Sequence, residues 1–403
     1  MSANSASKIA SEISSLLVHP ARGLALTRML AGDKVRSMLE RPHLYAYTRP
    51  HHPTEEMLAT VMHWLKGAHM RDGGIAAYYS LFSGFSASYP ETTGYIIPTL
   101  YDYAQLSGDR SYARMAEDAT TWLLHLQAPD GSFPGGLAGD DGGPSVFNTG
   151  QILQGLVRAA VETRDEKIQH SAFRAGCWLA DEQKSDGRWE GATYQGRAHS
   201  YYTMVALSLA NLSKALGDPR FQDAANRNLQ FTMSFQRSDG WYDQINLEGH
   251  PPYLHFVAYV IQGIVETALL AQNESAFESG RTAAWKLLRM FELKKSLPGE
   301  FADHWKTKSR FVCLTGMAQI SIVWLRIFEH TGDLRYLNAA LKINEFLKSH
   351  IRKTGGRNVR GGVAGSFPIH GRYQPFRLIS WGNKFTADAL MGEIKALQEI
   401  ERR

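Results

Sequence analysis

The chain has 403 residues, of which 44% are hydrophobic and 21% charged, so it carries ample material for a large folded core. Its two cysteines, Cys177 and Cys313, are too few for a disulfide framework and suit a reducing compartment. Neither a signal-peptide pattern nor an apolar run long enough to span a bilayer occurs, so we expect a cytoplasmic protein. The net charge of +5 slightly favours an anionic partner.

Residues 1–50 form an extension ahead of the repeated part of the chain. Within it, residues 21–41 alternate apolar and basic side chains in the pattern of an amphipathic helix. Two interpretations remain open. The helix packs on the outside of the domain, or it contacts a membrane surface or a partner in a biosynthetic complex, which would make the protein membrane-peripheral.

A repeated unit begins after this extension. An Asp that can cap a helix is followed, 13 residues later, by an aromatic residue, and in three units a Gln and then Asp-Gly follow. The spacing predicts a helix of about five turns with the aromatic on its buried stripe, ended by a turn. The capping residues are Asp109, Asp165, Asp218 and Asp333, with Asn273 in a degenerate fourth unit; the turns are at Asp130, Asp186 and Asp239.

A second, more apolar helix precedes each capped helix, so each unit is a helical hairpin of roughly 55 residues. These apolar helices are expected at 93–106, 149–162, 200–215, 255–271 and 313–330. Residues 55–72 match only the capped type, and residues 385–400 match only the apolar type. An open solenoid would leave two apolar ends uncovered, whereas two complementary halves complete a sixth hairpin. We therefore predict that residues 51–403 form an all-α (α/α)6 toroid with the apolar helices inside.

The stretch from Thr93 to Gly136 resembles units of the six-hairpin glycosidase superfamily and of the related terpenoid-cyclase toroids. YPETTGY, CLTGMAQ, LRYLNAA and GNKFTADALM are similar to uncharacterised toroid proteins associated with exopolysaccharide biosynthesis. The acidic motif with which terpene cyclases protonate an alkene has no counterpart here, so the QxxDG stretches are better explained as structural turns. The resemblance covers roughly residues 50 to 400, and it implies a toroid that acts in a polysaccharide context.

In such toroids, the resemblance implies that substrate sits in a funnel lined by the loops that enter the inner helices. Aromatic faces stack on sugar rings, and Arg or Lys can pair with carboxylates, so the residues of these loops suit an anionic oligosaccharide. The candidate substrate-binding residues are Tyr89, Tyr95, Asn148, Arg197, Tyr259, Trp305, Arg372, Trp381, Asn383 and Lys384.

Two kinds of catalysis fit the candidate catalytic residues Glu91, His199, Tyr202, Tyr253, His255, Asp303 and His304. A uronate lyase or C5-epimerase needs a group that neutralises the carboxylate, for which Arg197 or Asn148 is suited, and an acid and base, for which His and Tyr are suited. A glycosidase needs two carboxylates, and here Glu91 would pair with Asp303 or Asp243. Since acids are few beside many His and Tyr residues, the proton-transfer interpretation is preferred.

A third interpretation is a glycan-binding or scaffolding toroid without catalysis. No metal site is predicted, because the two cysteines are isolated and His250 and His255 are separated by two prolines. No cofactor is expected, since no phosphate-binding glycine motif follows a strand and almost no strand is predicted. No clustered basic face suggests nucleic-acid binding. The Gly- and Arg-rich segment 353–377 is either a disordered insertion or a basic lid over the ligand.

Overall fold

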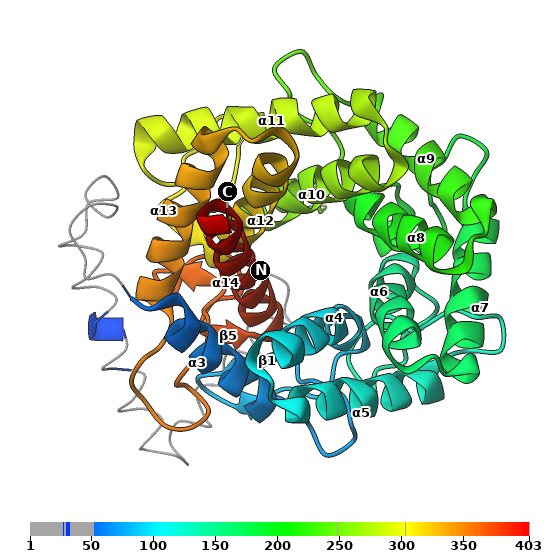
Figure 1. The fold of residues 1–403 in the computed structure, drawn as a ribbon, viewed down its shortest axis with the longest axis horizontal. Coiled ribbons are helices and arrows are strands. Elements are labelled where there is room, and N and C mark those ends of the chain that lie inside the picture. Colours follow the sequence, from blue (N-terminus) through cyan, green and yellow to red (C-terminus); the bar gives the residue numbers. More distant parts are fainter. Residues whose placement is uncertain (1–26, 28–29, 33–51, 248, 303, 403) are drawn as a thin grey trace.

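The computed structural model describes residues 27, 30–32, 52–247, 249–302 and 304–402, and within them the helices form two concentric rings (Figure 1). The predicted (α/α)6 toroid is confirmed. The inner ring consists of α4 (Pro90–Ser107), α6 (Val146–Thr163), α8 (Thr203–Leu216), α10 (Leu254–Ala271), α12 (Leu314–Thr331) and α14 (Ser380–Arg402). The outer ring consists of α5 (Arg110–Leu126), α7 (Glu166–Glu182), α9 (Pro219–Met233), α11 (Glu274–Lys294), α13 (Leu334–His350) and α3 (Thr54–Gly67). Residues 21–41 lie almost entirely outside the described part of the chain.

Each capped outer helix begins where the repeat predicts. The capping side chain accepts a hydrogen bond from a backbone N–H of the first turn, which satisfies a donor that has no partner inside the helix. These acceptor–donor pairs are Asp109–Ser111 (2.9 Å), Asp165–Lys167 (2.7 Å), Asp218–Arg220 (3.1 Å), Asn273–Ala276 (3.1 Å) and Asp333–Arg335 (3.0 Å).

The Gln side chain and the Asp-Gly turn of the repeat connect each outer helix to the next one. Gln183 donates from Nε2 to the carbonyls of Gly187 (3.2 Å) and of Ala224 in α9 (2.9 Å). Gly187 has a φ of +90°, and a Cβ there would lie 2.2 Å from the carbonyl oxygen of Arg227. Only glycine fits such a turn against the next helix. The QxxDG stretches are therefore structural turns.

The ring closes by pairing the first outer helix with the last inner one. Thr54 at the start of α3 donates to Glu393 Oε1 of α14 (2.6 Å), and Asn383 Nδ2 of α14 donates to the carbonyl of Val61 in α3 (3.2 Å). Figure 1 shows α3 and α14 side by side, although they lie at opposite ends of the chain. The two half-units are thus one hairpin, as predicted.

A buried cation strengthens this closure. Lys348 of α13 has no exposed surface; its Nζ lies 3.0 Å from Thr54 Oγ1 and 3.1 Å from Glu393 Oε1, and it also pairs with Glu345. We expect Lys348→Met to leave the Glu393 carboxylate buried without its cation, at a cost of about 3–5 kcal/mol in the free energy of unfolding. The double variant Lys348→Met/Glu393→Leu should recover most of this loss. Urea unfolding of the two variants tests both statements, and a single variant as stable as the parent contradicts the stabilising role of Lys348.

The two ends of the inner ring differ in the length of their connections. Two-residue links such as Gly108-Asp109 lead from inner to outer helices at one end, while long loops enter the inner helices at the other. The sequence predicts almost no strand, but these loops contain short antiparallel strands. Strand β1 (Tyr78–Ser80) pairs with β2 (Gly84–Phe85) and with β5 (Arg377–Ile379), and β3 (Val312–Cys313) pairs with β4 (Ser366–Phe367).

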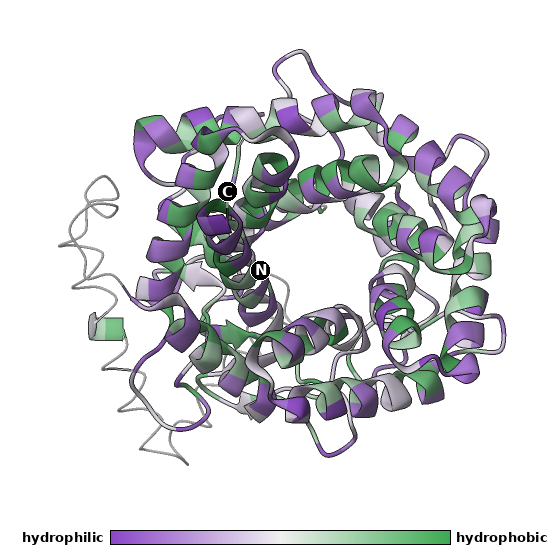
Figure 2. Ribbon diagram, viewed as in Figure 1, coloured by the Kyte–Doolittle hydropathy of each residue, from purple (hydrophilic) through white to green (hydrophobic). Residues whose placement is uncertain are grey.

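Apolar residues concentrate where the two rings face each other, and polar residues are more frequent on the outside (Figure 2). Helix α10 is the extreme case. By length and hydropathy (1.6) it could cross a membrane, but 72% of it is buried inside the ring. Its apolar character is that of an inner helix enclosed by its neighbours.

The last inner helix starts five residues earlier than the predicted 385–400, so Trp381, Asn383 and Lys384 belong to a helix and not to a loop. The Gly382-Asn383 pair favours a turn in isolation. In the fold, Asn383 is fully buried, accepts from the backbone N–H of Val363 (2.8 Å) and donates to two carbonyls. These tertiary hydrogen bonds override the local preference.

Candidate functional site

Glu91 lies in the first turn of α4, at the end of the ring where the long loops enter. Pro90 begins the helix, and the hydroxyl of Tyr89, just before it, donates to the Glu91 carboxylate. Within the described residues no cation pairs with this carboxylate. Burial raises the pKa of Glu91 to about 7, although the hydrogen bond from Tyr89 opposes the shift. A carboxyl group with this pKa can hold a proton near neutral pH and release it to a substrate.

Aromatic rings from several inner helices and from the loops that enter them gather beside Glu91; we call them the aromatic cluster. The centroids of neighbouring rings lie about 5 to 6 Å apart, the usual range for edge-on and offset contacts, as for Tyr95–Phe385 at 5.8 Å. The Glu91 charge contributes to the raised pKa of Tyr95, Tyr201, Tyr259 and Tyr373, although burial is the larger cause for each. The members are Tyr95, Phe147, Tyr201, Tyr259, Tyr373 and Phe385.

His255 lies in the first turn of α10 against the same cluster. Its ring centroid is 4.3 Å from that of Tyr259 and 5.5 Å from that of Tyr373. Its Nδ1 lies 2.6 Å from Oε1 of Gln319 in α12. Burial lowers the pKa of His255 to about 4, so the imidazole is neutral near pH 7 and can accept a proton. The structure thus brings a protonated acid and an unprotonated base to one aromatic cluster.

A close approach of two inner helices places Gln319 within reach of His255. Gly316, at the start of α12, packs against the beginning of α10, and a Cβ at Gly316 would lie 2.7 Å from the backbone nitrogen of His255. Glycine therefore permits this contact, and Gln319 follows almost one turn later on the same helix.

The other His and Tyr candidates are engaged in ring contacts or hydrogen bonds with neighbouring loop residues. His199 packs parallel to Tyr201 (4.9 Å), with its Nε2 3.1 Å from the Tyr194 carbonyl, and burial lowers its pKa. The hydroxyl of the fully buried Tyr202 accepts from the Tyr194 backbone N–H (3.2 Å). Tyr253 caps α10 and packs on Tyr373 (5.3 Å), with a pKa raised mainly by burial. His199 and Tyr253 thus flank the cluster. Tyr202 also contacts it, since its ring centroid lies 5.0 Å from that of Tyr201 and 5.8 Å from that of Phe147.

The acids predicted to partner Glu91 do not join it among the described residues. Asp243 forms an ion pair with Arg237 (2.6 Å) on the turn that ends the third unit. Asp303 lies outside the described residues. His304, its neighbour, has Nδ1 3.3 Å from Asp239 Oδ2, and its ring lies parallel to Trp241 at that same turn.

Four predicted sugar-binding side chains use their polar groups for hydrogen bonds within the protein. Trp305 donates to the Asp239 carbonyl (2.9 Å), and Trp381 donates to the Tyr373 hydroxyl (2.8 Å). Asn148 donates to the Pro134 carbonyl (3.0 Å), and Asn383 holds the ring closure as described. These residues shape the loops and the cluster, and Trp381 positions Tyr373.

The predicted cations occupy three different places. Arg197 is exposed and its charge lowers the pKa of His199, after burial as the larger cause. Arg372 is 70% exposed and lies 3.4 Å from Glu300, next to Tyr253, whose pKa it lowers against the dominant effect of burial. Lys384 pairs with Asp388 (2.6 Å), and its Nζ lies 4.2 Å from the centre of the Phe385 ring and 5.7 Å from that of Tyr95, both members of the cluster. Lys384 is therefore the predicted cation that contacts the cluster, while Arg197 and Arg372 lie beside its neighbours His199 and Tyr253.

Segment 353–377 is neither a disordered insertion nor a free-standing lid. It contributes β4 and buries most of residues 361–369, and Tyr373 enters the aromatic cluster. Arg377 lies 4.1 Å from the centre of the Tyr78 ring and donates to Gln374 (2.9 Å). The segment is therefore a fixed wall of the site, because its backbone is paired with the neighbouring loops.

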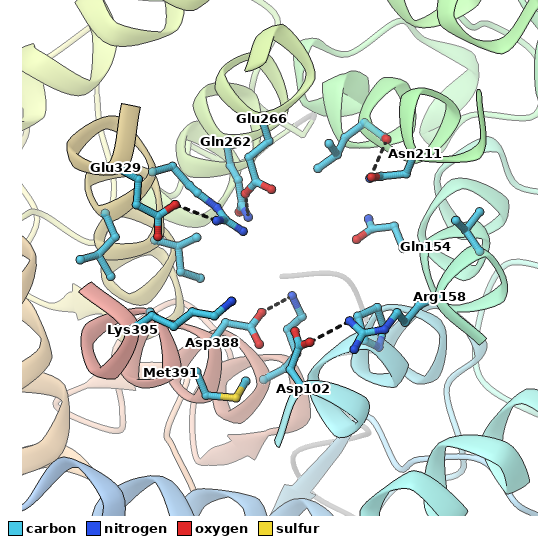
Figure 3. Close-up of a pocket in the computed structure, with 18 of the residues that line it drawn as sticks. Asp102, Gln154, Arg158, Asn211, Gln262, Glu266, Glu329, Asp388, Met391 and Lys395 are labelled. Atoms are coloured by element: carbon cyan, nitrogen blue, oxygen red, sulfur yellow. Dashed lines mark hydrogen bonds and ion pairs between the residues drawn. The ribbon is translucent and has the colours of Figure 1, made fainter. Parts of the chain in front are cut away.

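A cavity of about 830 Å³ opens at the other end of the inner ring, between the C-terminal halves of the inner helices (Figure 3). Acidic and basic side chains face each other there in pairs: Asp102 with Arg158 (2.7 Å), Glu329 with Arg326 (2.9 Å) and Asp388 with Lys384 (2.6 Å). The funnel predicted from the sequence was placed at the opposite end. Since these three acids are paired with cations, Glu91, which has no ion pair among the described residues, remains the better proton donor.

Gln319 and Gln262 were not singled out as functional by sequence reasoning. Gln319 and Gln262 are lone polar residues on buried inner-helix surfaces, and this was the available signal. Among the described residues, no three His, Cys, Asp or Glu side chains gather as a metal site.

Neither a family model nor a curated protein sequence matches this chain. Solved structures do match it in fold. An unsaturated glucuronyl hydrolase specific for heparin has a TM-score of 0.68 at 17% identity over 87% of this chain and 98% of its own. Cellobiose 2-epimerase from Spirochaeta thermophila gives 0.66 at 14% (86% and 97%), and unsaturated glucuronyl hydrolase from Bacillus sp. GL1 gives 0.65 at 14% (84% and 96%). At these identities the likeness establishes the shared toroid fold.

Proposed function

We propose that this protein is a carbohydrate-active enzyme that binds an anionic, uronate-containing oligosaccharide and transfers protons in the manner of a lyase or C5-epimerase. Glu91 is the acid, His255 is the base, and the aromatic cluster binds the sugar rings. The observation that carries the proposal is that Glu91, with a pKa near 7, and neutral His255 both lie beside the same aromatic cluster, where Tyr259 is near each of them.

The chemistry follows from these protonation states. Removal of the proton at C5 of a uronate requires a base, and His255 is unprotonated above pH 4. A proton must then reach either the leaving oxygen or the opposite face of C5, and Glu91 carries one below pH 7. Arg197 beside His199 and Arg372 beside Tyr253 would attract the carboxylate of the sugar. Structural neighbours named as glucuronyl hydrolases and as sugar epimerases support the choice of a saccharide.

Hydrolysis is the second candidate, and the raised pKa of Glu91 favours it too, because a glycosidase needs a protonated acid. It requires a further group that activates water. Asp243 is held by Arg237, so His255 is the better-placed base for this reaction as well. The two candidates share the site and differ in the product.

Incubation with uronate oligosaccharides distinguishes these reactions. Elimination yields an unsaturated uronate that absorbs in the ultraviolet, epimerisation exchanges the C5 proton with deuterium from the solvent without shortening the chain, and hydrolysis releases reducing ends without new absorbance. We expect one of the first two. Binding that is detected by calorimetry without any of the three products would show a non-catalytic glycan-binding toroid.

The pH dependence of kcat/KM should be bell-shaped. Protonation of His255 removes the base as the pH falls through about 4, and ionisation of Glu91 removes the acid as the pH rises through about 7. Activity is therefore expected between these two values. Steady-state rates in constant-ionic-strength buffers test the profile, and a rate that continues to rise above pH 8 would exclude Glu91 as the acid.

The proposed setting is exopolysaccharide metabolism in the cytoplasm, with a membrane or complex contact through residues 21–41. The supporting observations are the sequence resemblance and the basic amphipathic pattern of that segment. Fractionation of cells with and without residues 21–41 tests the contact.

A further inference from the structure

A chain of hydrogen bonds crosses the inner ring from the charged cavity to the aromatic cluster. Glu266 Oε1 accepts from Gln262 Nε2 (2.7 Å), Gln262 Oε1 accepts from Gln319 Nε2 (3.4 Å), and Gln319 Oε1 lies 2.6 Å from His255 Nδ1. Gln262 and Glu266 both line the cavity, and Figure 3 shows the two side chains joined there. His255 is at the other end of the chain, against Tyr259 and Tyr373.

The direction of this chain is set at Glu266. An ionised carboxylate only accepts hydrogen bonds, so the amide that faces it must present its NH₂ group. The negative charge of Glu266 is the largest cause of the raised pKa of Arg326, so this cation lies near the Glu266 carboxylate. Gln262 consequently presents its oxygen to Gln319, and Gln319 presents its oxygen to His255.

Because the Gln319 side chain presents its oxygen to His255, Nδ1 of His255 must carry the proton of this hydrogen bond. The imidazole is buried and neutral, so it has a single N–H, and Nε2 is left with a lone pair. Within the described residues Nε2 has no hydrogen-bond partner, and the residue is 5% exposed. Nε2 is therefore the ring nitrogen that remains to accept a proton from a bound substrate.

We propose that Glu266 is a positioning residue, which acts through Gln262 and Gln319 to hold His255 in the tautomer with Nδ1 protonated and Nε2 free to act as base. The inference rests on the proposed function only for the role of the base; the tautomer itself is a property of the fold. A carboxylate in the cavity at one end of the helix ring thereby determines which nitrogen of His255 acts as base at the other end.

Nitrogen-15 NMR of histidine-labelled protein reads this tautomer directly, with the His255 signals assigned by their loss in His255→Asn. We expect Nδ1 protonated and Nε2 unprotonated in the parent at pH 7. Gln319→Met removes the acceptor and should release the preference, whereas Gln319→Glu keeps an acceptor, should retain the tautomer and should raise the pKa of His255. Nε2 protonated in the parent, or an unchanged tautomer in Gln319→Met, overturns the proposal.

The role of Glu266 is tested by Glu266→Met, which removes the acceptor, against Glu329→Met, which alters a carboxylate of the same cavity outside the chain. Glu266→Met should lose the single tautomer and lower kcat by about ten- to a hundredfold, a size typical of supporting residues. Glu329→Met should keep both the tautomer and kcat, and a tautomer that Glu266→Met leaves intact refutes the role of Glu266. Loss of the tautomer in a protein that turns over no saccharide upholds the positioning and refutes the proposed enzyme function instead.

Discussion

Glu91→Gln is expected to lower kcat/KM for a uronate oligosaccharide by about 10²- to 10⁴-fold, the usual contribution of a positioned acid. Glutamine keeps the size of the side chain and an oxygen that accepts the hydrogen bond from Tyr89, but it has no proton to give. The basic limb of the pH profile should disappear in this variant, because the group that titrates near 7 is gone.

The matched control is Glu329→Gln, which makes the same change at the opposite end of the ring. We expect its kcat/KM to stay within a few-fold of the parent. If the two variants are equally active, the acid lies elsewhere. If only Glu329→Gln is inactive, catalysis belongs to the charged cavity and not to the aromatic cluster.

His255→Asn should reduce kcat by a similar factor, about 10²- to 10⁴-fold, because it removes the only described imidazole in the first turn of an inner helix beside this cluster. Exchange of the C5 proton with solvent deuterium should fall with it. The fold should survive, since Asn can still hydrogen-bond toward Gln319. Circular dichroism and the thermal midpoint separate loss of the base from loss of structure.

The control for this variant is His304→Asn, at the turn where His304 lies beside Asp239 and Trp241. We expect it to keep most of the activity. Deuterium exchange that persists at the parent rate in His255→Asn would show that His255 is not the base. Inactivation by His304→Asn alone would show that the base lies at the turn that ends the third unit, beside Asp239.

The architecture could be predicted from the sequence because its signals are local. The capping Asp109 and the turn at Asp186 act within a few residues of themselves, and the fold uses both as the spacing indicates. Closure followed from matching two half-units, which needs no three-dimensional information. The early start of α14 could not be predicted, since it depends on contacts of Asn383 with residues 61 and 361–363.

The site was only partly predictable. Glu91 and His255 stood out because each lies at the start of an inner helix among aromatic residues. Their protonation states depend on burial by Tyr259 and Tyr373, which come from other units of the ring, so no local pattern contains them. The same holds for Gln319, whose meaning as a partner of His255 arises from the packing of α12 on α10 at Gly316.

The decisive measurement is the pKa of Glu91, from the carbon-13 chemical shift of its labelled carboxyl group as a function of pH, assigned by its absence in Glu91→Gln. The structure predicts titration near 7. Titration near the ordinary value of 4.5 would mean that Glu91 is ionised at neutral pH and cannot donate the proton, and the proposed acid–base pair would be wrong.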